Sequence, residues 1–230
     1  ANQLYSAGTE IAAILETTRF RDYVSAAPYA FAAMRANEYL SKGAKLMQNL
    51  KNKGLKVQSA VSNLAAHGNG RFQKITYTAH SSEHEVEANA LLLHQGVVPN
   101  VQITRQVGAD HEWYEPQRYW RPKTDQWGTT SIETLAVAGD GAGIFGAEAA
   151  ALAGKLAALE TVHRAGKIDE LQRDVEAGPL MREHNRIAGV RPLLDRLYHP
   201  APEVLTPTDE TLVCRCEEVT AGDIRKCVEE

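Results

Sequence analysis

Cysteine is scarce in this sequence, and long apolar runs are missing from it. The 230 residues include three cysteines, all of which follow residue 210, so a disulfide-based scaffold is excluded. No apolar run approaches the length that a membrane span needs, and no signal peptide opens the chain. The sequence therefore gives no strong membrane signal and predicts a fold built around an ordinary apolar core.

Neither sign of charge is in large excess. The chain has 25 Lys and Arg against 29 Asp and Glu, a formal net charge of −4 at pH 7. This balance, without a basic stripe, argues against a nucleic-acid partner. The chain does not begin with Met, and its first eight residues resemble the end of a helix closed by Gly8. We therefore expect a fragment of a longer protein.

The most informative stretch, residues 134–158, reads TLAVAGDGAGIFGAEAAALAGKLAA. Its apolar run at 135–138 predicts a strand buried on both faces, followed by a glycine turn and an Ala-rich helix. Glycines allow a backbone to approach a ligand closely, and the amide groups that begin a helix suit a phosphate. Asp140 could bind sugar or ribitol hydroxyls, or it could simply cap the helix, and the spacing leaves both interpretations open.

An apolar segment bounded by acids, residues 10–16, predicts the second strand of a βαβ unit. Glu16 would lie at the strand end, where dinucleotide-binding folds place an acid that binds a ribose diol. A Glu that merely ends an exposed strand fits the pattern at least as well. Arg19 and Arg21 stand close by and could instead favour a 2′-phosphate, so NAD and NADP both remain open.

The following residues change from helical to strand periodicity. Residues 22–52 are predicted to be mostly helical, with a possible break at 42–45. Strands of alternating or fully apolar character are then expected at 57–61, 72–78, 85–89 and 90–94, the last of them buried. A G-x-x-P-N turn follows, in which Gly96 turns the chain, Pro99 fixes φ and Asn100 bonds local backbone.

Aromatic residues crowd residues 109–127, which contain all three tryptophans. This region is predicted to be an irregular cover or a subunit contact surface, and packing within the same chain is equally consistent with it. Further helices are expected up to residue 197, and a Pro-containing linker follows them.

Two thiols, Cys214 and Cys216, lie one residue apart before a helix that Thr220 and Asp223 open as a capping box. Such a pair can face one metal centre, but iron–sulfur clusters and zinc want about four soft ligands. From the residues alone, two free cysteines remain the simpler interpretation. Cys227 lies off the ligand pattern and is predicted to be structural.

These motifs carry a family resemblance. WGTTSIETL followed by AVAGDGAG resembles the second flavin-contacting motif of FAD/NAD(P)-binding oxidoreductases of the pyridine nucleotide-disulfide type, with Gly128, Thr130 and Ser131 at the motif positions. The match is most similar to the α subunits of opine oxidase, hydrogen cyanide synthase and dye-linked proline dehydrogenase complexes. VCRCEEVT resembles the start of a ferredoxin-like 2Fe–2S module.

The resemblance implies an α/β fold with two dinucleotide-binding domains, three-layered and Rossmann-like but incomplete, plus the start of a small C-terminal iron–sulfur module. The domains implied are a partial NAD(P)-type nucleotide-binding domain at 1–105, a returning segment of the FAD-binding domain at 106–168, a helical extension and linker at 169–210, and the module start at 211–230. The cofactor-binding residues implied are Gly139, Asp140, Gly141, Ala142, Gly96, Pro99 and Glu16.

The cofactors implied are FAD and a 2Fe–2S cluster in the full-length protein, and the second nucleotide site leaves NAD, NADP and ATP open. Cys214 and Cys216 would supply two cluster ligands, and the second pair would lie beyond Glu230. No catalytic acid or base is visible, and no C-x-x-C of a disulfide shuttle occurs in the nucleotide domain.

The expected function is an electron-transferring FAD-dependent oxidoreductase subunit of an amino acid or opine dehydrogenase or oxidase complex, whose partner is an FAD-containing β subunit. We expect it to be cytoplasmic, either free or peripheral to the inner membrane through an electron acceptor. Two alternatives remain: a stand-alone NAD(P)H-dependent flavin reductase, and a non-catalytic nucleotide-binding scaffold or relay subunit.

Overall fold

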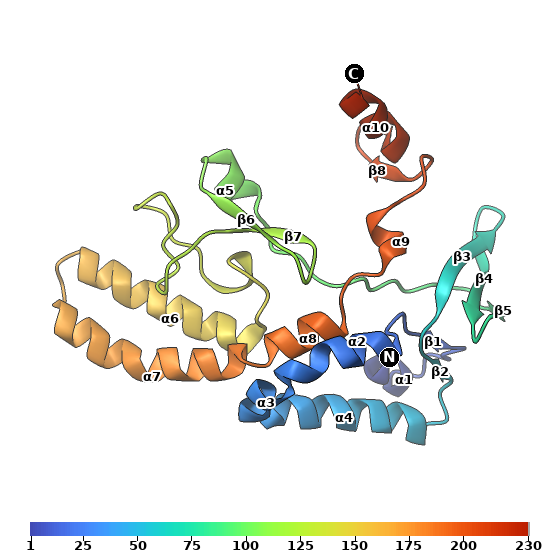
Figure 1. Cartoon of the computed structure of the whole chain (residues 1–230), viewed down its shortest axis with the longest axis horizontal. Coiled ribbons are helices and arrows are strands. Elements are labelled where there is room, and N and C mark those ends of the chain that lie inside the picture. Colours follow the sequence, from blue (N-terminus) through green and yellow to red (C-terminus); the bar gives the residue numbers. More distant parts are fainter. Residues whose placement is uncertain (230) are drawn as a thin grey trace. The chain divides into compact units, whose positions relative to one another are not determined.

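The computed structural model describes residues 1–229, apart from the side chains of Glu203 and Glu229. Glu230, the last residue of the predicted iron–sulfur module, lies outside the described residues. The chain, coloured by residue number in Figure 1, divides into two compact units. The first unit comprises residues 1–91 and 96–199, and the second comprises residues 92–95 and the segment from Pro200 onward.

The chain forms a mixed α/β fold in which runs of helices are followed by runs of short strands. The helices are α1 (Asn2–Ser6), α2 (Phe20–Ala26), α3 (Ala30–Ala33), α4 (Asn37–Asn52), α5 (Gln102–Gln106), α6 (Ala147–Arg164), α7 (Glu170–Ala188), α8 (Arg191–Leu197), α9 (Pro202–Leu205) and α10 (Ala221–Glu229). Three 3-10 turns are η1 (Ala27–Tyr29), η2 (Met34–Ala36) and η3 (Gly139–Gly141). The strands are β1 (Ile14–Leu15), β2 (Val57–Gln58), β3 (Ser62–Gly68), β4 (Phe72–Ala79), β5 (Ser82–Glu87), β6 (His111–Tyr114), β7 (Tyr119–Pro122), β8 (Leu212–Cys214) and β9 (Val219–Thr220).

Strands β1 and β2 form a parallel pair, with Ile14 opposite Val57. Parallel strands need a crossover, and here α2, α3 and α4 supply it, which confirms the helical prediction for 22–52. The predicted break at 42–45 is wrong, because α4 runs unbroken through Gly43. One glycine in an exposed helix costs only about 1 kcal/mol, which the rest of a 16-residue helix can offset.

Strands β3, β4 and β5 form an antiparallel sheet in that order. The strand predicted at 72–78 is confirmed as β4, whereas the one predicted at 85–89 begins earlier, at Ser82. Strand β3 was not expected from the sequence. Its pairing with β4 is irregular between Ser62 and Ala65, and Asn63 has a positive φ of 52°. This irregularity interrupts the alternation by which a strand is recognised.

Two predicted buried strands are not formed in the described residues. In the segment 90–94, Leu92 and Leu93 are 76% and 75% exposed. In the segment 135–138, the only ladder contact is an isolated bridge between Thr129 and Ala136. An apolar run becomes a buried strand only beside strands that pair with it. The described residues place no such strands next to either segment.

The aromatic region forms a β-hairpin, which corrects the prediction of an irregular cover. Trp113 lies opposite Trp120, and Tyr114 lies opposite Tyr119. The tryptophan ring centroids are 5.6 Å apart and those of the tyrosines 5.3 Å apart. Cross-strand aromatic pairs of this kind stabilise a hairpin.

Helices α6 and α7 lie side by side as a helical hairpin (Figure 1). Leu156 of α6 and Ala177 of α7 are buried together with Trp127. Between the helices, Glu160 accepts hydrogen bonds from Arg173 (2.8 Å) and Arg164 (2.7 Å). Burial would raise the pKa of Glu160, but the hydrogen bonds from the two arginines outweigh it and hold the pKa below its usual range.

The second unit is small. Its strands β8 and β9 are antiparallel, and α10 follows directly. Thr220 Oγ1 accepts from the N–H of Asp223 at 3.2 Å, while Asp223 Oδ2 accepts from the N–H of Thr220 at 3.0 Å. The predicted capping box is therefore confirmed.

We expect Glu160→Gln to destabilise the α6–α7 hairpin by about 2 kcal/mol, because Arg173 would lose an ionised partner in a buried place. Urea unfolding followed by circular dichroism measures this loss. The control is Glu170→Gln, since Glu170 contacts the same arginine at 3.4 Å from an exposed position and should change little. Equal effects of the two substitutions would contradict the role assigned to Glu160.

The lowered pKa of Glu160 also predicts an acid-sensitive contribution to stability. A carboxyl group whose folded pKa is depressed stabilises the fold above its unfolded pKa, and this stabilisation is lost as the pH falls through the folded value. Unfolding free energies measured from neutral pH down through the ordinary glutamate range should fall more steeply in the unaltered protein than in Glu160→Gln. Parallel pH profiles would rule this contribution out.

Candidate functional site

The glycine turn at Gly139–Gly141 packs tightly at the start of α6. Gly139 has a φ of +73°, and a Cβ built on it would lie 3.2 Å from the Cβ of Ala150. A Cβ built on Gly141 would lie 3.1 Å from Cγ1 of Val137. Gly139 thus needs both its backbone freedom and its small size, and a side chain there would push the turn away from the helix.

Asp140 binds the backbone that leads into α6. Its Oδ1 accepts hydrogen bonds from the N–H of Phe145 (3.1 Å) and of Gly146 (3.2 Å), and Gly146 is the N-cap of the helix. Helix α6 itself has no side-chain cap, so Asp140 holds the loop before the helix and does not cap the helix. Within residues 1–229, Oδ2 of the same carboxylate takes no hydrogen bond. One oxygen holds the turn, and the other is available to a ligand.

The G-x-T-S segment forms a tight loop that returns the chain to the glycine turn. Gly128 has a φ of +83°, and a Cβ there would meet the carbonyl oxygen of Val137 at 2.5 Å. Thr130 Oγ1 donates to the carbonyl of Leu135 at 3.0 Å, and the N–H of Asp110 donates to Ser131 Oγ at 2.8 Å. The motif residues thus shape the approach to Asp140.

The hairpin contributes residues to this site that the sequence reasoning missed. Tyr119 Oη accepts the N–H of Ile144 at 3.4 Å, directly after the glycine turn. On the same strand pair, Tyr114 donates its hydroxyl to Asp195 of α8 at 2.8 Å. Burial raises the pKa of Asp195, although Tyr114 and Arg191 both contact its carboxylate. The alternation of Trp and Tyr in 113–120 was the signal that could have revealed the hairpin.

Glu16 of the second predicted nucleotide site lies at the end of a strand, as the sequence predicted. Glu16 directly follows β1, and its N–H donates to the carbonyl of Gln58 at 2.9 Å. Ser59, which follows β2, donates its hydroxyl to Glu16 Oε2 at 2.9 Å. Glu16 therefore lies at the carboxyl ends of two parallel strands, where α/β folds bind ligands.

The G-x-x-P-N segment leads into α5. Gly96 has a φ of +106°, and Pro99 is buried. Asn100 Oδ1 accepts the N–H of Gln102 at 3.2 Å, so the predicted bond of Asn100 to local backbone is confirmed. No hydrogen bond connects Glu16 with the glycine turn in the part of the chain that the structure describes.

The cysteines are free thiols. Cys214, at the end of β8, is half-buried, and Cys216 is exposed in the turn that follows. Cys227 is exposed on α10, which corrects its interpretation as a structural residue. Among residues 1–229, no group of three His, Cys, Asp or Glu could hold a metal ion. The described residues thus supply two neighbouring thiols but no complete metal site.

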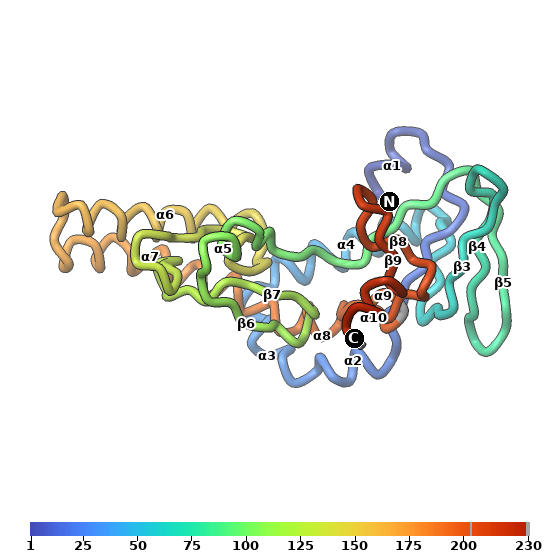
Figure 2. The backbone as a smooth tube through the Cα atoms, turned by 90° about the horizontal axis from the view of Figure 1, so that it is seen from above, coloured from blue at the N-terminus to red at the C-terminus, as the bar shows by residue number. Residues whose placement is uncertain are grey.

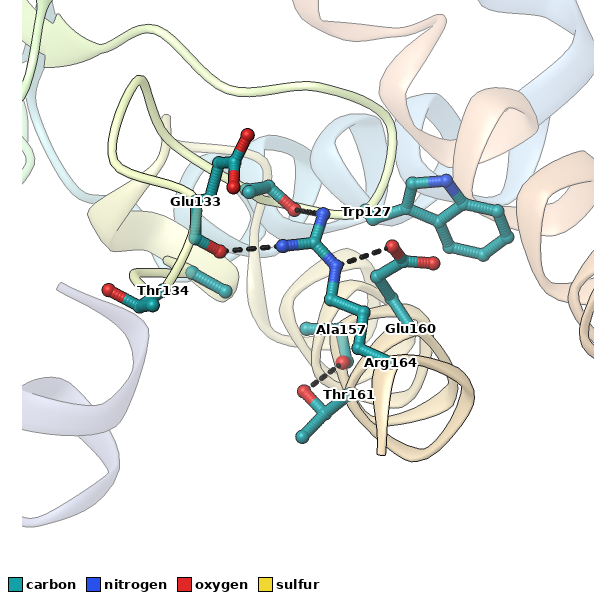
Figure 3. Close-up of a pocket in the computed structure, with 9 residues that line it drawn as sticks. Trp127, Glu133, Thr134, Ala157, Glu160, Thr161 and Arg164 are labelled. Carbon is teal, nitrogen blue, oxygen red and sulfur yellow. Dashed lines mark hydrogen bonds and ion pairs between the residues drawn. The ribbon is translucent and has the colours of Figure 1, made fainter. Parts of the chain in front are cut away.

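A cavity of about 440 Å³ lies between the loop after Trp127 and the second half of α6 (Figure 3). Arg164 crosses its wall and donates to Glu160 Oε1 (2.7 Å), the carbonyl of Glu133 (2.6 Å) and Thr129 Oγ1 (3.2 Å). The cavity contains none of the predicted cofactor-binding residues, and Arg164 is already bound to protein groups. We therefore assign it to packing of the loop on α6.

None of the helices described in residues 1–229 has the length and apolar character required to cross a membrane.

Comparison with known proteins finds similarity to proteins named as subunits of oxidoreductases. No protein-family model matches it. It is 34% identical to the A subunit of opine oxidase from Rhizobium meliloti over 229 residues, which cover 99% of this chain and 43% of that protein. It is 28% identical to the HcnB subunit of hydrogen cyanide synthase from Pseudomonas aeruginosa over 244 residues, covering 100% of this chain and 51% of that protein.

A solved structure, the L-proline dehydrogenase from P. horikoshii, shares the fold with a TM-score of 0.52 at 18% identity. The match covers 82% of this chain and 35% of that chain. This chain spans about half the length of the curated relatives it matches. The resemblance expected from the motifs is confirmed: this chain is a relative of the opine oxidase A subunits and of HcnB.

Proposed function

We propose that this chain is part of an electron-transferring, FAD-dependent oxidoreductase subunit that works on an amino acid or opine within a complex. The observation that supports this most strongly is the similarity to the A subunit of opine oxidase along 99% of the chain. Relatives named as subunits of opine oxidase and hydrogen cyanide synthase support the assignment to a complex, in which an FAD-containing β subunit would be the partner.

The glycine turn fits a flavin dinucleotide. Gly139 and Gly141 bring the backbone close to the start of α6, and the first amide groups of this 18-residue helix suit an anionic group. Asp140 Oδ2 would accept a hydrogen bond from the ribitol chain, while Oδ1 keeps the turn in place. Bound FAD would supply the electron-transfer chemistry. The residues of the turn, Ala142 included, would bind and orient it.

The second nucleotide, NAD(P) or ATP, would lie beside Glu16, with the Gly96 and Pro99 turn closing the same domain. Glu16 would bind the ribose diol from the end of β1, and Ser59 fixes its carboxylate at 2.9 Å. This proposal follows the predicted domain at 1–105, continued by the returning FAD segment at 106–168, in a Rossmann-like fold with two dinucleotide-binding domains.

Cys214 and Cys216 would supply two thiolate ligands of a 2Fe–2S cluster. Cys214 ends β8, and Cys216 lies in the turn that follows. The thiol of Cys216 is exposed and is therefore accessible to a cluster that both cysteines would bind. A cluster takes four ligands, and the described residues offer only this pair. We therefore propose the pair as half of a cluster site in the full-length protein.

We expect the intact gene product, purified with any partner chain that accompanies it, to be yellow-brown. Its absorbance spectrum should show flavin bands and an iron–sulfur shoulder that bleaches on reduction, and mass spectrometry of the released nucleotide should identify FAD. A stand-alone flavin reductase would oxidise NAD(P)H without any partner chain. A colourless protein that carries ATP or no nucleotide would refute the flavin assignment.

The two oxygens of Asp140 can be tested separately. In Asp140→Asn the amide oxygen can still accept from Phe145 and Gly146, but the ribitol acceptor becomes a donor, so FAD affinity should fall about tenfold, or roughly 1.4 kcal/mol, with little change in melting temperature. Asp140→Ala should lower both. The measurements are FAD titration by fluorescence and thermal unfolding. Asp125→Asn, which alters another loop carboxylate, serves as the control. Unchanged FAD affinity in Asp140→Asn would exclude the ribitol contact.

A further inference from the structure

The crossover between β1 and β2 exposes its large apolar residues and buries its small ones. On α2, Phe20, Tyr23 and Val24 have the i, i+3, i+4 spacing of one helix face, and they are 83%, 54% and 58% exposed. Phe31 and Met34 continue the exposure in α3 and η2, at 73% and 55%. Figure 2 shows α2 leading into α3, with both on the same side of α4.

The opposite side of the same segment is already packed. Asp22 and Ala26 of α2 are buried, and α2 lies against α8. Ala33 and Ala36 are completely buried in a cluster with Val190. The inner face of this segment thus has its partners within the chain, and the large apolar side chains lie on the other face. Contiguous exposed apolar residues of this size indicate a surface that binds something.

Charge in this crossover differs from charge in the rest of the chain. Residues 16–56 contain eight Lys and Arg and three Asp and Glu, a net charge of +5 in a chain whose net charge is −4. Each of the three acids is occupied: Glu16 accepts from Ser59, Asp22 is buried, and Glu38 is paired with Arg186. The crossover thus carries a net positive charge, and two of its exposed arginines, Arg21 and Arg35, directly follow the exposed apolar residues Phe20 and Met34.

We propose that this crossover, residues 16–56, docks on the surface of an anionic lipid bilayer. Phe20, Val24, Phe31 and Met34 would enter the boundary between headgroups and acyl chains, and Arg21 and Arg35, both exposed, would contact anionic headgroups. A helical face that combines aromatic and aliphatic residues with basic neighbours is the pattern of interfacial binding. The net charge of this segment is positive although that of the whole chain is negative, and this makes the surface complementary to anionic lipid.

The test is flotation of the intact protein with vesicles of phosphatidylcholine alone or mixed with phosphatidylglycerol. We expect binding to the anionic vesicles, little binding to the neutral ones, and loss of binding at high salt. Phe20→Ser/Phe31→Ser should weaken binding at least about tenfold, because two large apolar side chains no longer enter the bilayer. Arg21→Gln/Arg35→Gln should weaken it and flatten its salt dependence.

The matched control is Leu171→Ser/Val175→Ser, which removes two equally exposed apolar residues (74% and 67%) from α7. Thermal unfolding of every variant separates a binding defect from a folding defect. The proposal is overturned if the unaltered protein fails to float with anionic vesicles or if the crossover and control variants bind them equally. It is also overturned if the crossover variant loses only its association with a protein partner, because the surface would then belong to that partner.

Discussion

The close contact between the glycine turn and α6 is the constraint on which the candidate flavin site depends. Gly139 can approach Ala150 only without a side chain, since a Cβ would already be at 3.2 Å. That approach brings Asp140 within reach of the N–H groups of Phe145 and Gly146. It also positions Ile144 to donate to Tyr119 of the hairpin. A bulkier residue at 139 would thus disturb the hydrogen bonds of Asp140, the helix start and the hairpin contact together.

Local sequence signals predicted the local structure well. The glycine turn before an Ala-rich helix, the bond from Asn100 to nearby backbone and the Thr220 capping box were all predicted from residues a few positions apart, and the structure has each of them. Such features need no distant partner. The two apolar runs at 90–94 and 135–138 were predicted as buried strands on composition, but burial of a strand is decided by its neighbours in a sheet, which the run itself does not encode.

The same reasoning explains what could be predicted of the candidate site. Asp140 and Glu16 stand out in the sequence because each carboxylate follows an apolar segment, and the structure places Glu16 at the end of a parallel strand. The hairpin residues Tyr114 and Tyr119 lie far in sequence from the groups that they bind, Asp195 and Ile144. These partners are 81 and 25 positions apart, and contacts over such separations produce no periodic pattern in the sequence. The sequence therefore indicated only an aromatic cluster.

A local structural role of Asp140 and a cofactor contact do not compete once the geometry is considered. Oδ1 accepts from the two backbone amides that precede α6, and a serine or threonine could have done this with its single oxygen. Only a carboxylate adds a second acceptor that the turn does not use. The choice of aspartate over a hydroxyl side chain therefore favours a ligand with hydroxyl groups to donate. The two hydrogen bonds of Oδ1 supply the rigidity that such a contact needs, because a carboxylate fixed by two amides loses little freedom when the ligand binds.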